Sequence, residues 1–173
     1  MTPRVALFAL VLLAPLTAQA RSLAGAGLSY GADINQAGLN VGYLVELPDT
    51  SLRVGGIGTV FFPSDERDET GFDISTTLVT ADLVVQWRLL DRDPVYLYLT
   101  GGLHLDFARA SFTFDDPNRS APADNEWGLG VLAGGGADFD LGFSGLFIEA
   151  AMVGTSGAFS QLLVHSGLRI WFN

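Results

Sequence analysis

The stretch that decides the fold is "VYLYLTGGLHLDF", residues 95–107, in which two kinds of residue alternate. One set is apolar or glycine (Val95, Leu97, Leu99, Gly101, Leu103, Leu105 and Phe107), and the other is mostly polar (Tyr96, Tyr98, Thr100, Gly102, His104 and Asp106). Successive side chains of a β-strand point to opposite faces, so this stretch predicts a strand with one apolar and one polar face. The next question is which of the two faces meets water.

The same period of two recurs along the rest of the chain. It predicts about eight strands, near residues 23–33, 39–47, 52–62, 75–89, 95–107, 127–139, 143–153 and 159–172. Short turns at 48–51, 91–94 and 140–142 alternate with longer acidic links at 63–73 and 113–126, so the tight turns gather at one end of an up-and-down sheet. This pattern is typical of an all-β chain that forms an eight-stranded antiparallel up-and-down transmembrane β-barrel.

The first residues predict export. Arg4 precedes an apolar run at 5–16, and "AQA" at 18–20 has the small residues of a cleavage site. The apolar run is shorter than the roughly 20 residues of a spanning helix. We therefore expect a cleaved signal peptide at 1–20, Sec-type export, and one barrel domain at 21–173.

The charge and cysteine content exclude several classes of function. The formal net charge is −10 and the chain has no lysine, so it offers no basic patch to a nucleic acid. It also has no cysteine, which rules out disulfides, zinc–thiolate sites and a thiol nucleophile. We predict no cofactor, no metal site and no catalytic residues.

The polar faces of the predicted strands collect charged residues, and a membrane barrel turns this face inward. We predict an interior polar network of Glu46, Arg53, Asp82, Arg88, His104, Asp106, Asp138, Glu149, His165 and Arg169. Pairing Leu47 with Leu52 across the turn at 48–51 places Glu46 opposite Arg53. The later turns place Asp82 opposite Gly102 or His104, and Glu149 near Leu163 or His165.

Aromatic residues lie on the apolar faces near both strand ends. Phe62, Phe107 and Trp127 lie beside the long links, and Trp87, Phe139 and Phe172 lie beside the tight turns. Two aromatic girdles at the two bilayer interfaces account for this placement. We therefore expect the apolar faces to meet lipid.

The C-terminal sequence "HSGLRIWFN", residues 165–173, resembles the sorting signal of the small outer-membrane β-barrels of Gram-negative bacteria, the OmpA/OmpX-like superfamily. The matching positions are His165, Gly167, Ile170 and Phe172, whereas Asn173 departs from the aromatic that usually ends the signal. The resemblance implies this fold, the bacterial outer membrane, and recognition by the barrel-assembly machinery during biogenesis. It implies no activity, because this fold hosts adhesins, anchors, lipid A enzymes and narrow pores.

These features favour a non-enzymatic barrel in envelope integrity or surface interaction, with a polar plugged interior and acidic external loops. Two alternatives stay open: a lipid A acyl hydrolase or transferase that uses the region of His104 or His165, and a narrow, porin-like solute pore. The first needs a lipid to reach histidines that face inward, and Ser166, next to His165, points to the opposite face.

The long links suggest partners. Carboxylates gather at Asp65, Glu66, Asp68, Glu69 and Asp73, and again at Asp115, Asp116, Asp124 and Glu126. We expect these segments outside the cell and both termini in the periplasm. The expected partners are outer-membrane lipid and lipopolysaccharide, with divalent cations or a basic partner at the acidic links. We expect the protein to be a monomer.

Overall fold

The computed structural model describes residues 21–67, 72–114, 124–156 and 160–172. These residues form strands β1 (Ser22–Gly31), β2 (Gln36–Glu46), β3 (Leu52–Phe61), β4 (Ser64–Arg67), β5 (Phe72–Arg92), β6 (Val95–Phe114), β7 (Asp124–Asp140), β8 (Ser144–Thr155) and β9 (Ser160–Phe172). Both β3 and β4 pair with β5, at Leu52–Val60 and Ser64–Arg67 respectively. Strand β4 therefore continues β3 along β5, and β3 and β4 together count as one strand of the barrel.

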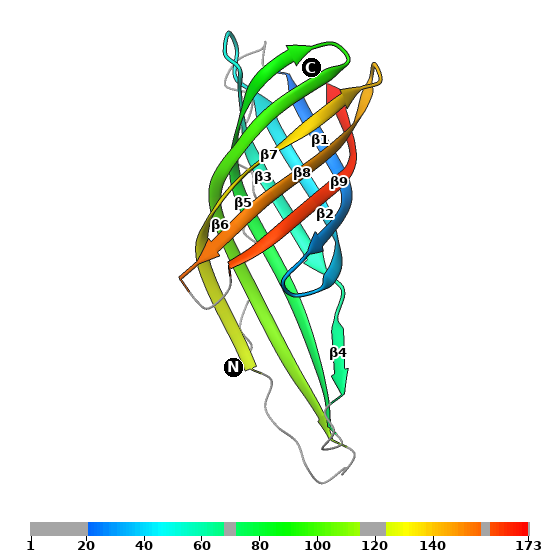
Figure 1. Ribbon diagram of the computed structural model, residues 1–173, viewed down its shortest axis with the longest axis vertical. Coiled ribbons are helices and arrows are strands. Elements are labelled where there is room, and N and C mark those ends of the chain that lie inside the picture. The colour runs from blue at the N-terminus through cyan, green and yellow to red at the C-terminus, as the bar shows by residue number, and fades with distance from the viewer. Residues whose placement is uncertain (1–20, 68–71, 115–123, 157–159, 173) are drawn as a thin grey trace.

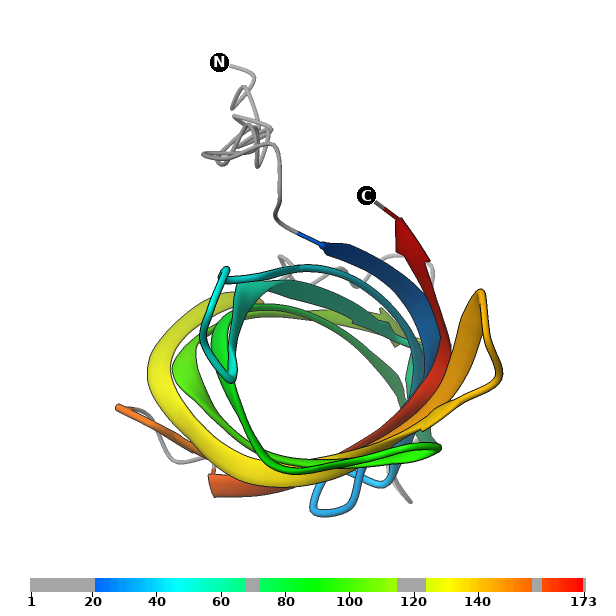
Figure 2. The same ribbon diagram turned by 90° about the horizontal axis from the view of Figure 1, so that it is seen from above.

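The strands close into a barrel (Figures 1 and 2). They follow the order β3-β2-β1-β9-β8-β7-β6-β5-β4, and an additional pairing of β3 with β5 closes the ring. All neighbours are antiparallel, and the first and last strands pair from Ser22–Phe172 to Gly31–Leu163. The predicted fold, a closed eight-stranded antiparallel barrel, is confirmed. In the part of the chain that the structure describes, no helix is long and apolar enough to cross a membrane.

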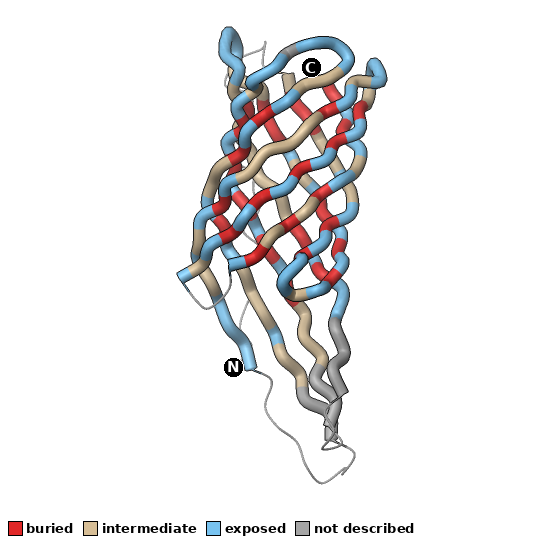
Figure 3. The backbone as a smooth tube through the Cα atoms, in the orientation of Figure 1, coloured by how far each residue is buried: buried red, intermediate tan, exposed pale blue. Residues whose placement is uncertain are grey.

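Burial alternates along the strands, as Figure 3 shows. In β8, Phe147, Glu149 and Ala151 are buried, whereas Ile148 and Met152 are exposed. The opening stretch behaves in the same way: in β6, Tyr98, Thr100 and His104 point into the lumen, and Leu99 and Leu103 are about half exposed on the outer wall. The apolar face of the predicted strands is thus the outer face of the barrel.

Polar and apolar side chains both point into the lumen. Besides the polar groups, it contains buried apolar side chains such as Phe61, Leu132 and Trp171. The predicted interior network did not include these apolar side chains. A barrel of eight strands encloses only enough space for side chains, so the large apolar residues pack there between the polar groups.

The two ends of the barrel differ. Tight turns join β2 to β3, β5 to β6 and β7 to β8 at the upper end of Figure 1, and Leu47 donates its backbone N–H to Leu52 across the first of these turns. At the lower end, β4, β5, β6 and β7 project beyond the other strands (Figure 1). We call these the tight-turn end and the long end.

The interpretation of residues 63–73 as a loop is partly wrong. Strand β4 occupies Ser64–Arg67 and β5 begins at Phe72, so Asp65, Glu66 and Asp73 belong to strands. Strand β7 likewise begins at Asp124, inside the link predicted at 113–126. At 64–67 and 124–126 every residue is polar, so the sequence lacks the alternation by which a strand is recognised. The predicted signal peptide and Asp68, Glu69, Asp115, Asp116 and Asn173 lie outside the described residues.

Candidate functional site in the barrel lumen

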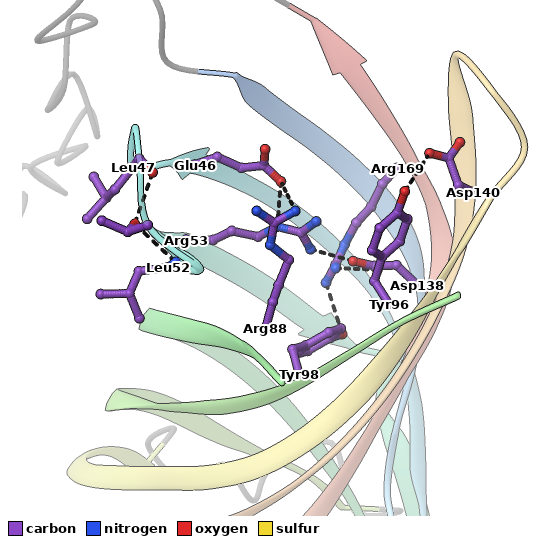
Figure 4. A network of polar contacts seen from close by, with 11 residues as sticks. Glu46, Leu47, Leu52, Arg53, Arg88, Tyr96, Tyr98, Asp138, Asp140 and Arg169 are labelled. Carbon is purple, nitrogen blue, oxygen red and sulfur yellow. Dashed lines mark hydrogen bonds and ion pairs between the residues drawn. The ribbon is translucent and has the colours of Figure 1, made fainter. Parts of the chain in front are cut away.

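A layer of ion pairs crosses the lumen near the tight-turn end (Figure 4). The charged layer consists of Glu46, Arg53, Arg88, Asp138, Glu149 and Arg169, which are contributed by β2, β3, β5, β7, β8 and β9. The turn between β2 and β3 places Glu46 directly opposite Arg53, and Arg53 Nε donates to Glu46 Oε1 at 2.9 Å. Arg88 Nη1 lies 3.6 Å from the same Glu46 oxygen. Sequence spacing around one turn thus creates the first pair of the layer.

Asp138 joins two arginines that come from distant strands. Arg53 Nη1 donates to Asp138 Oδ2, and Arg169 Nη1 donates to Asp138 Oδ1 at 2.6 Å. Arg53 is 1% exposed and Asp138 is also 1% exposed, so water contributes little to solvating these charges. Buried charges are stable only when they are paired and hydrogen-bonded, and each oxygen of Asp138 has its own arginine.

Arg169 extends the layer toward the middle of the barrel. Its Nη2 donates to Tyr98 Oη at 3.4 Å and lies 3.9 Å from Glu149 Oε2. Its guanidinium also lies over the Phe147 ring, at 4.2 Å from the centroid. Gln86 Nε2 donates to Glu149 Oε2 at 2.8 Å, which gives this carboxylate a second partner. The layer combines three arginines with three carboxylates and is formally neutral.

The predicted pair of Asp82 and His104 lies closer to the long end. The two residues are opposite each other in the β5–β6 register, and His104 Nδ1 lies 2.5 Å from Asp82 Oδ1. His104 Nε2 lies 3.7 Å from Asp106 Oδ2, which is beyond hydrogen-bond distance. His104 has no exposed surface, so this imidazole is fixed between two carboxylates inside the lumen.

His165 has a partner that sequence reasoning missed. The register places Glu149 opposite His165, but the hydrogen bond of the imidazole is with Ser29, at 2.7 Å from Nδ1 to Oγ. Asn40 Nδ2 donates to the same Ser29 oxygen at 2.8 Å. The pairing of β1 with β9 brings Ser29 and His165 together, and the only sequence signal for it is the general rule that a barrel closes its first strand on its last.

A serine beside a histidine is the arrangement of acyl hydrolases, but this pair lacks room for a lipid substrate. Ser29 and His165 are each 3% exposed, and the cavity beside His165 and Glu149 has a volume of about 20 Å³. That volume holds about one water molecule. Ser166 is exposed on the outer wall, on the face opposite to His165.

The predicted girdle residues lie on the outer wall. Trp127, Trp87, Phe62, Phe172 and Phe139 are 41–67% exposed, and Phe107 is partly covered by Trp127, whose ring centroid is 4.6 Å away. On the same wall, Phe172 and Tyr43 have ring centroids 6.2 Å apart near the tight-turn end. Sequence reasoning left out Phe143, which is 79% exposed beside the turn between β7 and β8.

The residues of the C-terminal motif divide between the two faces of β9. His165 points into the lumen, whereas Ile170 and Phe172 are exposed on the outer wall. At Gly167 a Cβ atom would lie 2.2 Å from the backbone oxygen of Ala26, so the glycine permits the close approach of β9 to β1. Among the described residues, no group of three or more histidine, aspartate or glutamate side chains is arranged to hold a metal ion.

Comparisons with known proteins find the fold but no family. No protein-family model matches the chain, and no curated protein matches it. Solved structures do match, among them a major outer membrane protein from Thermus thermophilus, with a TM-score of 0.72 and 17% identity over 88% of this chain and 99% of that one. Neisserial surface protein A gives a TM-score of 0.57 at 15% identity, and Ail, the attachment invasion locus protein of Yersinia pestis, gives 0.54 at 16%. Each of these two alignments covers 88% of this chain and 97% of the other.

Identities this low show a shared fold and nothing further about activity. The similar structures and the closed barrel described above agree on one architecture. This chain has the fold of the small eight-stranded outer-membrane β-barrels.

Proposed function

We propose that this chain is an outer-membrane protein of a Gram-negative bacterium, with a lumen closed to solutes and a non-enzymatic role in envelope integrity or surface interaction. The observation that carries the proposal is the charged layer, in which Arg53 of β3 reaches Asp138 of β7. These two strands are separated by β5 and β6 on one side of the ring, so the contact crosses the lumen. The fold and the similar outer membrane proteins support the location.

The outer wall supports insertion into lipid. Leu28, Val41, Leu103, Val131 and Ile148 are each more than half exposed, and they come from five different strands. Monomeric soluble proteins rarely expose so continuous an apolar surface. In the proposed orientation the tight-turn end faces the periplasm, and the signal peptide at 1–20 is removed during Sec-type export. Contacts with lipopolysaccharide, with the assembly machinery, and with cations or a basic partner at Asp65, Glu66 and Asp73 remain predictions.

Current through single barrels tests the closed lumen. In planar bilayers, the wild-type protein is expected to give no conductance steps, because an ion would have to displace the buried arginines. The variant Arg53→Ala with Asp138→Ala removes the cross-lumen contact and is expected to conduct. The matched control, Arg92→Ala with Asp93→Ala, makes the same change of charge at two exposed residues, the last of β5 and the first of the turn to β6, and is expected to be silent.

Two results would contradict closure of the lumen by the charged layer. Steps of equal size from the wild-type protein and the charged-layer variant would show that the layer does not block the lumen, and they would favour the narrow pore. Silence from every variant would show that the apolar side chains of the lumen, rather than the ion pairs, close it.

A further inference from the structure

A cavity of about 130 Å³ opens in the lumen at the long end of the barrel. Its walls come from β2, β5, β6, β7, β8 and β9 and from the β1–β2 turn. The polar lining includes the carboxylates of Asp106 and Glu126, the amides of Gln36 and Gln161, and two threonine side chains. The apolar lining includes Ile34 and Leu78. The cavity therefore has the mixed lining of a small-ligand site.

Two small residues leave room for the two carboxylates. Asp106 lies opposite Gly128 in the β6–β7 register, and Glu126 lies opposite Ala108. A Cβ atom at position 128 would be 2.2 Å from Asp106 Oδ1, so the carboxylate occupies the space that a side chain on β7 would fill. Asp106 and Glu126 are diagonal neighbours across the strand pair, which places both on the same side of the cavity.

The charge at this end favours a cation. No arginine is among the described residues that line the cavity. The basic group next to Asp106 is His104, whose Nδ1 lies 2.5 Å from Asp82 Oδ1 and whose Nε2 lies 3.7 Å from Asp106 Oδ2. Even with a charged imidazole, Asp82, Asp106 and Glu126 leave an excess of negative charge. A cation in the cavity would be attracted by both lining carboxylates.

A buried acceptor in the lining lacks a donor. Gln161 is 3% exposed, and its side-chain oxygen accepts no hydrogen bond from the described residues. An unsatisfied buried acceptor is unfavourable, and a ligand with several N–H groups satisfies it. An alkylammonium group carries three such donors. Leu78 and Ile34 offer apolar contact to its carbon chain, which a bare metal ion does not have.

We propose that this cavity binds a small primary alkylammonium ion, with its N–H groups directed to Asp106, Glu126 and the amide oxygen of Gln161. This site is separate from the charged layer, which lies toward the other end of the lumen. It does not depend on whether the barrel conducts. A binding result and a conductance result therefore test two different claims.

Titration of the protein, purified in detergent micelles, with butylammonium chloride tests the proposal. Backbone amide NMR signals of Gly128, Ala108 and Gln161 are expected to shift in a saturable way, and neutral butanol is expected to cause no such shift. Asp106→Asn and Glu126→Gln are each expected to weaken binding by roughly tenfold or more, because each removes a charge-assisted hydrogen bond. Ala108→Leu keeps every charge but fills the cavity, so it is expected to abolish binding.

Asp124→Asn is the matched control. It makes the same change of charge on β7, two residues from Glu126, at an exposed position outside the lining. Equal weakening by Asp124→Asn and Asp106→Asn would show attraction to the acidic surface rather than a site, and would overturn the proposal. Absence of saturable shifts, or displacement of butylammonium by calcium chloride at a far lower concentration, would overturn it as well.

Discussion

At the scale of single residues, Arg53 shows how a buried charge is paired in the lumen. Its guanidinium is buried and bonds to carboxylates on two strands, Glu46 of β2 and Asp138 of β7. A buried ion pair adds little net stability by comparison with apolar packing, but the loss of one partner leaves the other charge buried and unpaired. The residue is therefore needed because its neighbours are charged.

Arg53→Met tests this reading. The substitution keeps most of the side-chain volume and removes the charge, so we expect the free energy of unfolding to fall by about 3–5 kcal/mol. Urea titration of the barrel in lipid vesicles, followed by tryptophan fluorescence, measures the change. Arg92→Met, at an exposed position, is the control and is expected to leave the midpoint nearly unchanged. Equal midpoints for the two variants would contradict a dependence of the carboxylates on Arg53.

Gly145 shows how tightly the lumen is packed. A Cβ atom at this position would lie 2.0 Å from Cη2 of Trp171, so Gly145→Ala has to displace a large buried ring. We expect a loss of about 1–3 kcal/mol in unfolding free energy and an altered tryptophan emission. Gly154→Ala in the same strand is the control, because its Cβ would meet nothing within 4 Å. If Gly145→Ala lowered the unfolding free energy no more than Gly154→Ala, the Trp171 ring would have to move aside without cost, which would contradict tight packing.

Sequence could predict only part of these contacts. The pair of Glu46 and Arg53 follows from one tight turn, since the turn fixes the register. The contact between Arg53 and Asp138, 85 residues apart, depends on how the strands tilt around the ring. The bond of Ser29 with His165 depends on closure in the same way. Alternation shows which residues face inward, but it does not show which inward residues meet across the lumen.

At the scale of the elements, β5 and β4 differ in the number of strands with which they pair. In the barrel body, β5 is paired on both sides, so Val85 faces Val54 of β3 and Gly101 of β6. At the long end, one edge of β4 pairs with β5. No strand among the described residues pairs with the other edge of β4. The same backbone change should therefore cost more in β5 than in β4.

Proline substitutions measure that difference. Proline lacks the N–H that a sheet needs, and within sheets it is tolerated mainly at edges. We expect Val85→Pro to prevent folding and Glu66→Pro in β4 to leave the barrel intact. Migration on SDS gels with and without heating distinguishes folded from unfolded barrel. A folded Val85→Pro variant, or an unfolded Glu66→Pro variant, would contradict the assigned pairings.

The elements also show where pattern reading fails. Every strand of the barrel body could be predicted from alternation, because one side chain in two is buried there. The strand at 64–67 could not, because all four of its residues are polar and show no alternation. Charged composition alone suggested a loop.

At the scale of the whole molecule, the two ends of the barrel predict an orientation in the membrane. Thr50 lies in the turn between β2 and β3, at the tight-turn end, and Ser64 begins β4 at the long end. The chain has no cysteine, so a single introduced one reports on one site. We expect Ser64→Cys to react with an impermeant maleimide in intact cells, and Thr50→Cys to react only after the outer membrane is opened. The reverse result would invert the proposed orientation.

The seam between β1 and β9 constrains the timing of folding. Ser29 and His165, which bond across it, are 136 residues apart, so this contact cannot form until all of the intervening chain has been made. Contacts this distant in sequence slow folding, because the entropy of loop closure is lost before the contact forms. Until β9 arrives, β1 and β8 are both available for pairing with other chains. A chain interrupted before β9 keeps both of these strand edges unpaired and is prone to aggregate. Protection of the two edges before closure thus matters as much to this chain as any contact in the finished barrel.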